Sequence, residues 1–107
     1  PGVTVTSYRD LEVWCVSMEL ARRVYAATTR MAWPHRAEIG SQMRRASVSA
    51  PSNIAEGFRQ GSPRAYVRHV RIAAGSIAEL ETQLDLACDL HLMSEGEAAE
   101  MRAMAAK

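Results

Sequence analysis

The sequence predicts an all-α fold, an up-and-down antiparallel bundle of four helices. Apolar residues recur at steps of three and four along three stretches of the chain, the spacing of one buried helical face. Proline, glycine and serine interrupt these stretches at residues 32–34 and 60–63. The 107 residues are 48% hydrophobic and 23% charged, a composition typical of one folded domain.

The first helix is predicted from about Asp10 to Met31, so that residues 1–9 form an N-terminal tail and residues 10–107 the bundle. One apolar row follows helical spacing: Leu11, Trp14, Met18, Ala21, Tyr25 and Thr28. A second row widens the buried face: Leu20, Val24, Ala27 and Met31. We expect a face of this width to pack on more than one neighbour.

The second helix is predicted from Pro34 to about Phe58, because proline suits a first helical turn and disfavours helix at the residue before it. Its inward row is Ile39, Met43, Ala46, Ala50, Ile54 and Phe58. Pro51 lies inside this helix, where its missing donor and its ring cost about 3 kcal/mol. We therefore expect one helix that is kinked at Pro51, with nearby polar side chains satisfying freed groups: Ser47, Ser49, Ser52 and Asn53.

The third helix is predicted to follow a turn at Gly61, with Ser62 as its N-cap and Pro63 at its first position. It carries the most regular apolar row of the chain: Tyr66, Val70, Ala73, Ile77, Leu80, Leu84, Ala87 and His91. Ser94 and Glu97 form a capping box that opens a short fourth helix. Because this helix is short, part of the third helix lacks a fourth partner, which self-association or residues beyond 107 would supply.

The near-zero net charge of +1 hides a segregation of charge along the chain. Residues 22–71 hold ten arginines and two acids, whereas residues 72–107 hold seven acids and two bases. Arginine suits phosphate, carboxylate and protein interfaces, so the basic middle could face nucleic acid or an acidic partner. Alternatively, these arginines pair with the acidic final third, within one chain or between copies.

Two charged ridges are predicted on the third helix. Arg64, Arg68 and Arg71 form a basic ridge, which Arg44, Arg45 and Arg59 of the second helix extend if the two converge. The acids Glu81, Asp85 and Asp89 form a ridge of like charge, which is mildly destabilising unless a partner neutralises it. A solvated acidic face and pairing with the arginines of another copy both remain open.

The sequence offers no pattern that indicates an enzyme, a cofactor, a metal site or a small-molecule substrate. The residues three before the histidines are not glutamates, and no phosphate-binding or nucleophile motif occurs. Cys15 and Cys88 are expected to be reduced core residues. The absence of a long apolar window and of a signal-peptide pattern predicts a cytoplasmic protein without a membrane partner.

Three segments together, YRDLEVW, SQMRRASVSAPSNIAEGF and VRIAAGSIAELETQLDLACDL, resemble a bacterial family named for reading frames in intervening sequences of large-subunit ribosomal RNA. The resemblance implies an antiparallel four-helix bundle and a homopentameric ring. The family includes the accessory protein of diversity-generating retroelements, a strongly basic ring that binds RNA and reverse transcriptase. The resemblance also implies that Pro51 to Gly57 packs on the third helix, with buried or interfacial polar groups at Arg44, Arg45, Asn53 and Glu56.

Two functional hypotheses follow from the sequence and the resemblance. The first is a non-catalytic bundle that assembles with itself, as a pentamer, and acts as a scaffold or accessory binding protein. The alternative is an RNA-binding accessory factor, for ribosomal RNA or a retroelement ribonucleoprotein, that uses the arginines at positions 44, 45, 59, 64, 68 and 71.

Overall fold

A computed structural model describes residues 4–106, which form helices and no strand. A 3₁₀ turn at Tyr8–Asp10 precedes α1 (Glu12–Thr29). A π-helical turn at Arg36–Gly40 leads directly into α2 (Ser41–Arg59), and α3 (Pro63–Asp89) and α4 (Glu95–Ala105) complete the chain. The predicted all-α fold with a short fourth helix is confirmed.

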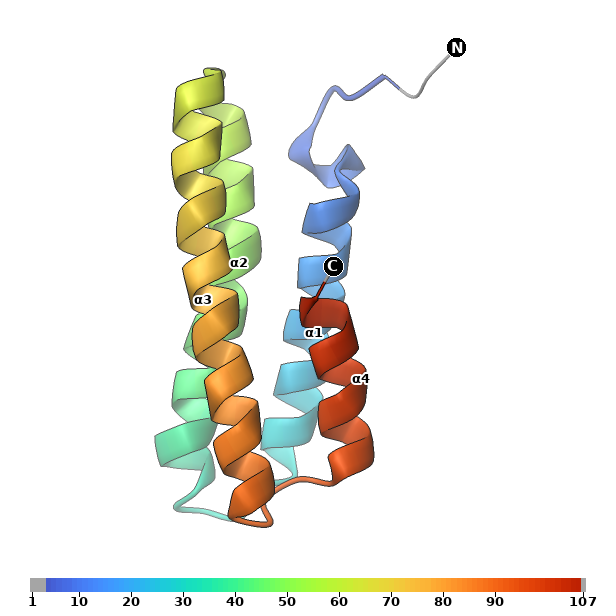
Figure 1. Cartoon of the computed structure of the whole chain (residues 1–107), viewed down its shortest axis with the longest axis vertical. Helices are drawn as coiled ribbons and strands as arrows, with labels where there is room; N and C mark the ends of the chain where they lie inside the picture. Colours follow the sequence, from blue (N-terminus) through green and yellow to red (C-terminus); the bar gives the residue numbers. More distant parts are fainter. Residues whose placement is uncertain (1–3, 107) are drawn as a thin grey trace.

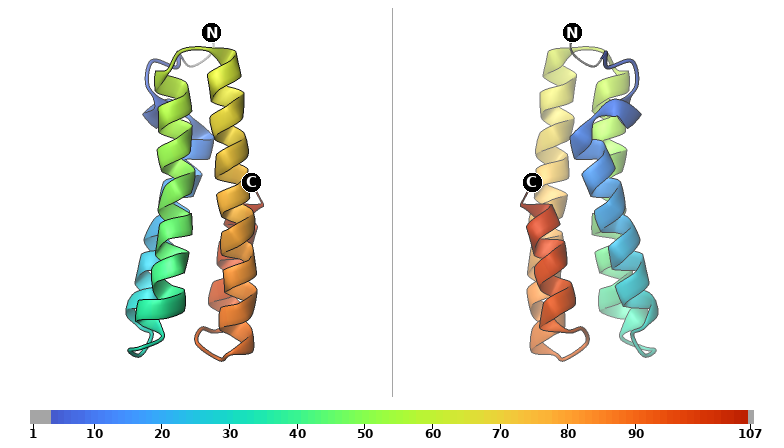
Figure 2. Two further views of the ribbon diagram at one scale, coloured as in Figure 1. Left: turned by 90° about the vertical axis from the view of Figure 1, so that its left-hand side faces the viewer. Right: turned by 90° about the vertical axis from the view of Figure 1, so that its right-hand side faces the viewer.

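The helices run up and down in order around the bundle (Figure 1). α1 packs on α2, α2 packs on α3, and α4 lies between α3 and α1. The bundle is elongated, 46 × 25 × 18 Å, and α4 ends about halfway along it (Figures 1 and 2). Only the end of the bundle that holds α4 therefore has four helices in cross-section.

The core is divided in the same way along the long axis. Large side chains fill the four-helix end, where six are almost fully buried: Leu20, Val24, Met43, Leu80, Leu84 and Met101. At the other end the buried apolar cluster consists of Ala50, Ile54 and Ala73, with Leu11, Trp14 and Ile77 packed partly against it. The second predicted row of α1 is thus the deeper one, whereas Tyr25 of the first row is 44% exposed.

The helix boundaries follow local sequence signals closely. Ser62 caps α3, since its Oγ accepts a hydrogen bond from the Ala65 backbone N–H at 3.1 Å, and Gly61 takes the predicted left-handed conformation, with φ of 78°. Ser94 caps α4 through the Glu97 backbone N–H, while the Glu97 carboxylate pairs with Arg30. Helical turns of the second helix begin two residues after Pro34.

α2 continues as α-helix through Pro51, which is buried. The predicted kink at this residue is not confirmed. Polar side chains of the same helix bond to its backbone: Ser47 Oγ donates to the Arg44 carbonyl at 2.9 Å, and Asn53 Nδ2 donates to the Ser49 carbonyl at 2.9 Å. The tail predicted over residues 1–9 falls partly outside the described residues, and the division into tail and bundle stays a prediction.

Candidate functional site

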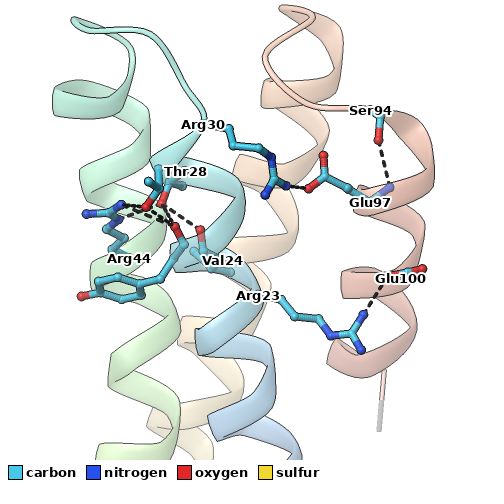
Figure 3. A network of polar contacts seen from close by, with 10 residues as sticks. Arg23, Val24, Thr28, Arg30, Arg44, Ser94, Glu97 and Glu100 are labelled. Carbon is cyan, nitrogen blue, oxygen red and sulfur yellow. Dashed lines mark hydrogen bonds and ion pairs between the residues drawn. The ribbon is translucent and has the colours of Figure 1, made fainter.

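Arg44 is the least exposed of the six predicted arginines and lies between α1 and α2 (Figure 3). Its Nε donates to Thr28 Oγ1 at 2.7 Å and its Nη2 to Thr29 Oγ1 at 2.9 Å. The guanidinium also lies 4.6 Å from the centroid of the Tyr25 ring. A side chain held by three neighbours on α1 joins the two helices, so Arg44 has a structural contact that the other predicted arginines lack.

The six predicted arginines do not form one surface. Arg45 is exposed near the start of α2, where its Nη2 contacts Ser41 Oγ at 3.4 Å. The distance along α2 from Arg45 to Arg59 is about 21 Å at the helical rise. Arg44 and Arg45 are therefore remote from Arg64 and its neighbours, which lie at the opposite end of the bundle.

The remaining four arginines do gather where α2 connects to α3. Arg64, Arg68 and Arg71, called the basic ridge below, are exposed on α3, and Arg59 lies 5.8 Å from the Tyr8 ring centroid. Within residues 4–106, none of these four forms an ion pair. Their charges therefore remain available to a partner.

The Asn53, Glu56 and Gly57 motif converges on one buried histidine of α3. Asn53 Oδ1 lies 3.0 Å from His69 Nδ1, and Glu56 Oε2 lies 3.5 Å from the same nitrogen. A Cβ on Gly57 would lie only 2.7 Å from the His69 Cβ. The absence of a side chain at Gly57 thus lets α2 and α3 approach closely, and the polar residues beside it hold the histidine.

The amides of Asn53 and Gln60 indicate which ring nitrogen of His69 donates and which accepts. Because Asn53 Nδ2 donates to Ser49, its Oδ1 must accept from His69 Nδ1–H. The other ring nitrogen, Nε2, lies 3.1 Å from Gln60 Nε2 and accepts from that amide. Both ring nitrogens are occupied in joining α2 to α3, which is a structural role.

Sequence reasoning missed His69, although a signal was present. His69 lies three residues after Tyr66 and four before Ala73, so it shares the apolar face of α3. Asn53 and Gly57 are four apart on α2 and share a face in the same way. A buried polar residue on one helix requires a polar partner on the next, which these positions supply.

The acidic end of the chain is partly neutralised within the chain itself. Arg23 pairs with Glu100 at 2.7 Å, and Arg30 pairs with Glu97, so α1 is linked to α4 (Figure 3). Arg102 binds Asp85 of α3 at 2.7 Å. The hydrogen bonds that Arg102 donates to the Asp85 carboxylate raise the pKa of Arg102. Pairing within one chain is thus confirmed for these residues, while the basic ridge has no such partner among those described.

The cysteines differ from the expectation that both are core residues. Cys15 is exposed and Cys88 is half-buried, and both are free thiols. Burial, with the nearby Glu95 carboxylate, raises the pKa of the Cys88 thiol. Residues 4–106 contain no group of three or more histidine, cysteine, aspartate or glutamate side chains placed to hold a metal ion.

An apolar groove of about 690 Å³ runs between α1 and α3, beyond the end of α4. α1 lines one wall with Glu12, Val13, Val16, Ser17 and Leu20, and α3 lines the other with Tyr66, Val70, Ala73, Ala74, Ile77 and Glu81. Ala50 and Ile54 of α2 form the floor, and Met104 and Ala105 of α4 close one end. This surface, called the open groove below, occupies the corner that a longer fourth helix would fill.

A second groove, of about 540 Å³, lies between α1 and α2. Trp14, Met18, Arg22, Val48 and Pro51 are among its lining residues. In the described part of the chain, no helix is long and apolar enough to cross a membrane.

A family model described as 23S rRNA-intervening sequence protein matches residues 9–107. The match covers all four α-helices and the histidine contact between α2 and α3. No curated protein matches the chain.

Proposed function

Because the chain belongs to the 23S rRNA-intervening sequence protein family, we propose that it is a non-enzymatic bundle that assembles with copies of itself and serves as a scaffold or accessory binding protein. The open groove carries this proposal. Apolar side chains of α1 and α3 line this groove and leave it open to solvent in the described chain, and exposed apolar grooves are typical of protein interaction sites. The proposal includes a cytoplasmic location, where Cys15 and Cys88 would stay reduced.

The test is the mass of the protein in solution, measured by light scattering across a dilution series. We expect a homo-oligomer at micromolar concentration, with five copies, the number that the family resemblance implies. Dilution should dissociate it, because assembly depends on concentration. A mass of about 11.8 kDa at every concentration, that of the single chain, would contradict the proposal.

A second candidate function is binding to structured RNA, as an accessory factor for ribosomal RNA or a retroelement ribonucleoprotein. The observation that favours it is the basic ridge together with Arg59, four arginines without an ion pair in the described structure. The family description also refers to 23S ribosomal RNA. Arg44 is excluded from this candidate surface by its contacts with α1.

The RNA hypothesis has a quantitative signature. Neutralising about four phosphates predicts that the affinity falls about 100-fold between about 50 and about 200 mM salt. Replacing Arg64 and Arg68 by alanine should reduce both the affinity and the salt slope, whereas Arg45→Ala, at the other end of the bundle, should change neither. Absence of binding at low salt, or binding insensitive to salt, would refute RNA binding through these arginines.

A further inference from the structure

The dimensions of the open groove indicate what kind of element fills it. α3 has 27 residues and α4 only 11, so roughly 24 Å of α3 extends beyond the reach of α4. The corner between α1 and α3 is bounded by two helices and floored by small α2 side chains. Such a site accepts the side of another helix, which brings apolar side chains to its floor.

The charged residues of the open groove indicate which charge its partner should carry. Glu12 of α1 and Glu81 of α3 lie on its two walls. Within residues 4–106 neither carboxylate forms an ion pair. A helix therefore binds in the groove most favourably if it presents positive charge beside its apolar side chains.

The outer face of α3 carries that combination at its N-terminal end. Val67 is 49% exposed and Ile72 is 47% exposed, and the basic ridge runs between them. Arg64 lies in the first turn of α3, where a positive charge opposes the helix macrodipole. A partner with negative charge would neutralise Arg64 and cover the exposed apolar groups beside it.

We infer that the basic ridge of one copy docks in the open groove of the next copy. This inference rests on the proposed self-assembly and names its two surfaces. Arg64 and Arg68 lie against the acidic walls at Glu12 and Glu81, and Val67 and Ile72 cover the apolar lining. The ridge is exposed to solvent while the groove residues face α1, so the two surfaces occupy different sides of one helix. A contact between two different surfaces is heterologous and can close into a ring of identical subunits.

The second groove, between α1 and α2, is a poorer partner for the ridge. Arg22 is one of its lining residues, as are Tyr25 and Tyr8, and Arg44 and Arg59 lie over those two rings. A basic ridge brought to this basic surface would meet like charges. The distribution of charge therefore selects the open groove.

The test is a charge exchange between the two surfaces. The ridge variant carries Arg64→Glu and Arg68→Glu, the groove variant carries Glu12→Arg and Glu81→Arg, and the combined variant carries all four. We expect the ridge and groove variants to lose the assembled mass, and the combined variant to regain it, because opposite charges face each other again. A control with the same change in net charge as the ridge variant, Arg36→Glu with Arg45→Glu, should assemble like the unmodified chain.

The alternative outcomes are distinguishable. Arg64→Glu places an acid in the first turn of α3, where it favours the helix, so loss of mass with unchanged circular dichroism does not reflect unfolding. If the unmodified chain assembles but the ridge and groove variants keep its mass, the contact lies elsewhere and this inference fails while self-assembly stands. If the combined variant stays monomeric and folded, the inference fails as well. Loss of RNA binding in the ridge variant without loss of mass would instead assign the ridge to nucleic acid.

Discussion

Gly57→Ala tests whether the close approach of α2 and α3 depends on the missing side chain. The added Cβ would lie 2.7 Å from the His69 Cβ and 3.2 Å from the Tyr66 Cα. Because both atoms are held by the backbone of α3, the helices must separate to relieve the overlap. Overpacking of this kind costs about 1–3 kcal/mol, whereas alanine gains about 0.5–1 kcal/mol over glycine in a helix. We expect a net loss of about 1–2 kcal/mol.

Gly75→Ala is the matched control. Gly75 also lies inside a helix, but a Cβ there would meet nothing within 4 Å. Only the helical preference for alanine then applies, and the free energy of unfolding should rise by about 0.5–1 kcal/mol. The two substitutions are chemically identical, so their opposite signs isolate the contact with His69.

The assay is urea unfolding followed by circular dichroism, with all variants at one protein concentration because assembly contributes to apparent stability. A loss of 1–2 kcal/mol in a domain of this size also lowers the melting temperature, by about 4–8 °C per kcal/mol. If Gly57→Ala were as stable as Gly75→Ala, the close approach of α2 and α3 would not require glycine, and the argument would be wrong.

Three further predictions concern single residues. Arg44→Ala should destabilise the chain by about 1–3 kcal/mol, because it leaves the buried Thr28 hydroxyl and the α1 end without their donor; Arg45→Ala, measured in the same urea titration, should stay within about 0.5 kcal/mol. The carboxylate of Asp10 accepts hydrogen bonds from the backbone N–H groups of Thr6 and Ser7, which lower its pKa below the ordinary value of 3.8. The contribution of Asp10 to the stability of the fold is therefore complete above the ordinary pKa and is lost as the pH falls through the pKa of the folded state. The melting temperatures of Asp10→Asn and the unmodified chain should therefore differ at neutral pH and converge in acid; a constant difference would refute the capping role. Leu84→Ala should cost about 2–5 kcal/mol in urea, since Leu84 is fully buried, and a smaller loss would show that the core collapses around it.

The helices and their ends could be predicted because their causes are local. Ser62, Pro63 and Gly61 act through hydrogen bonds and backbone angles within a few residues, so the start of α3 follows from the sequence alone. The depth of each apolar row could not be predicted in this way. Val24 is fully buried while Tyr25 is exposed, because burial depends on which neighbour each face of α1 meets.

The candidate site was predicted less completely than the fold. The sequence identified the basic ridge, and the family resemblance identified the motif at Asn53, Glu56 and Gly57. Arg44 was predicted both as an extension of the ridge and as an interfacial polar group, and His69 was missed. Arg44 binds α1 residues that are 15 and 16 positions away in the chain. Helical periodicity describes which residues share a face, and it contains no information about the partner of that face.

The sequence by itself determined that this chain forms four helices, that the fourth is short, and that positive and negative charges occupy different parts of the chain. These properties depend on spacing and composition, which act over one or two helical turns. Only the tertiary structure decided which arginines are already paired, that a histidine joins α2 to α3, and that an acidic-walled groove stays open beside α3. Those outcomes depend on contacts between helices, where a charge or an apolar face is either neutralised by its neighbour or left for another molecule.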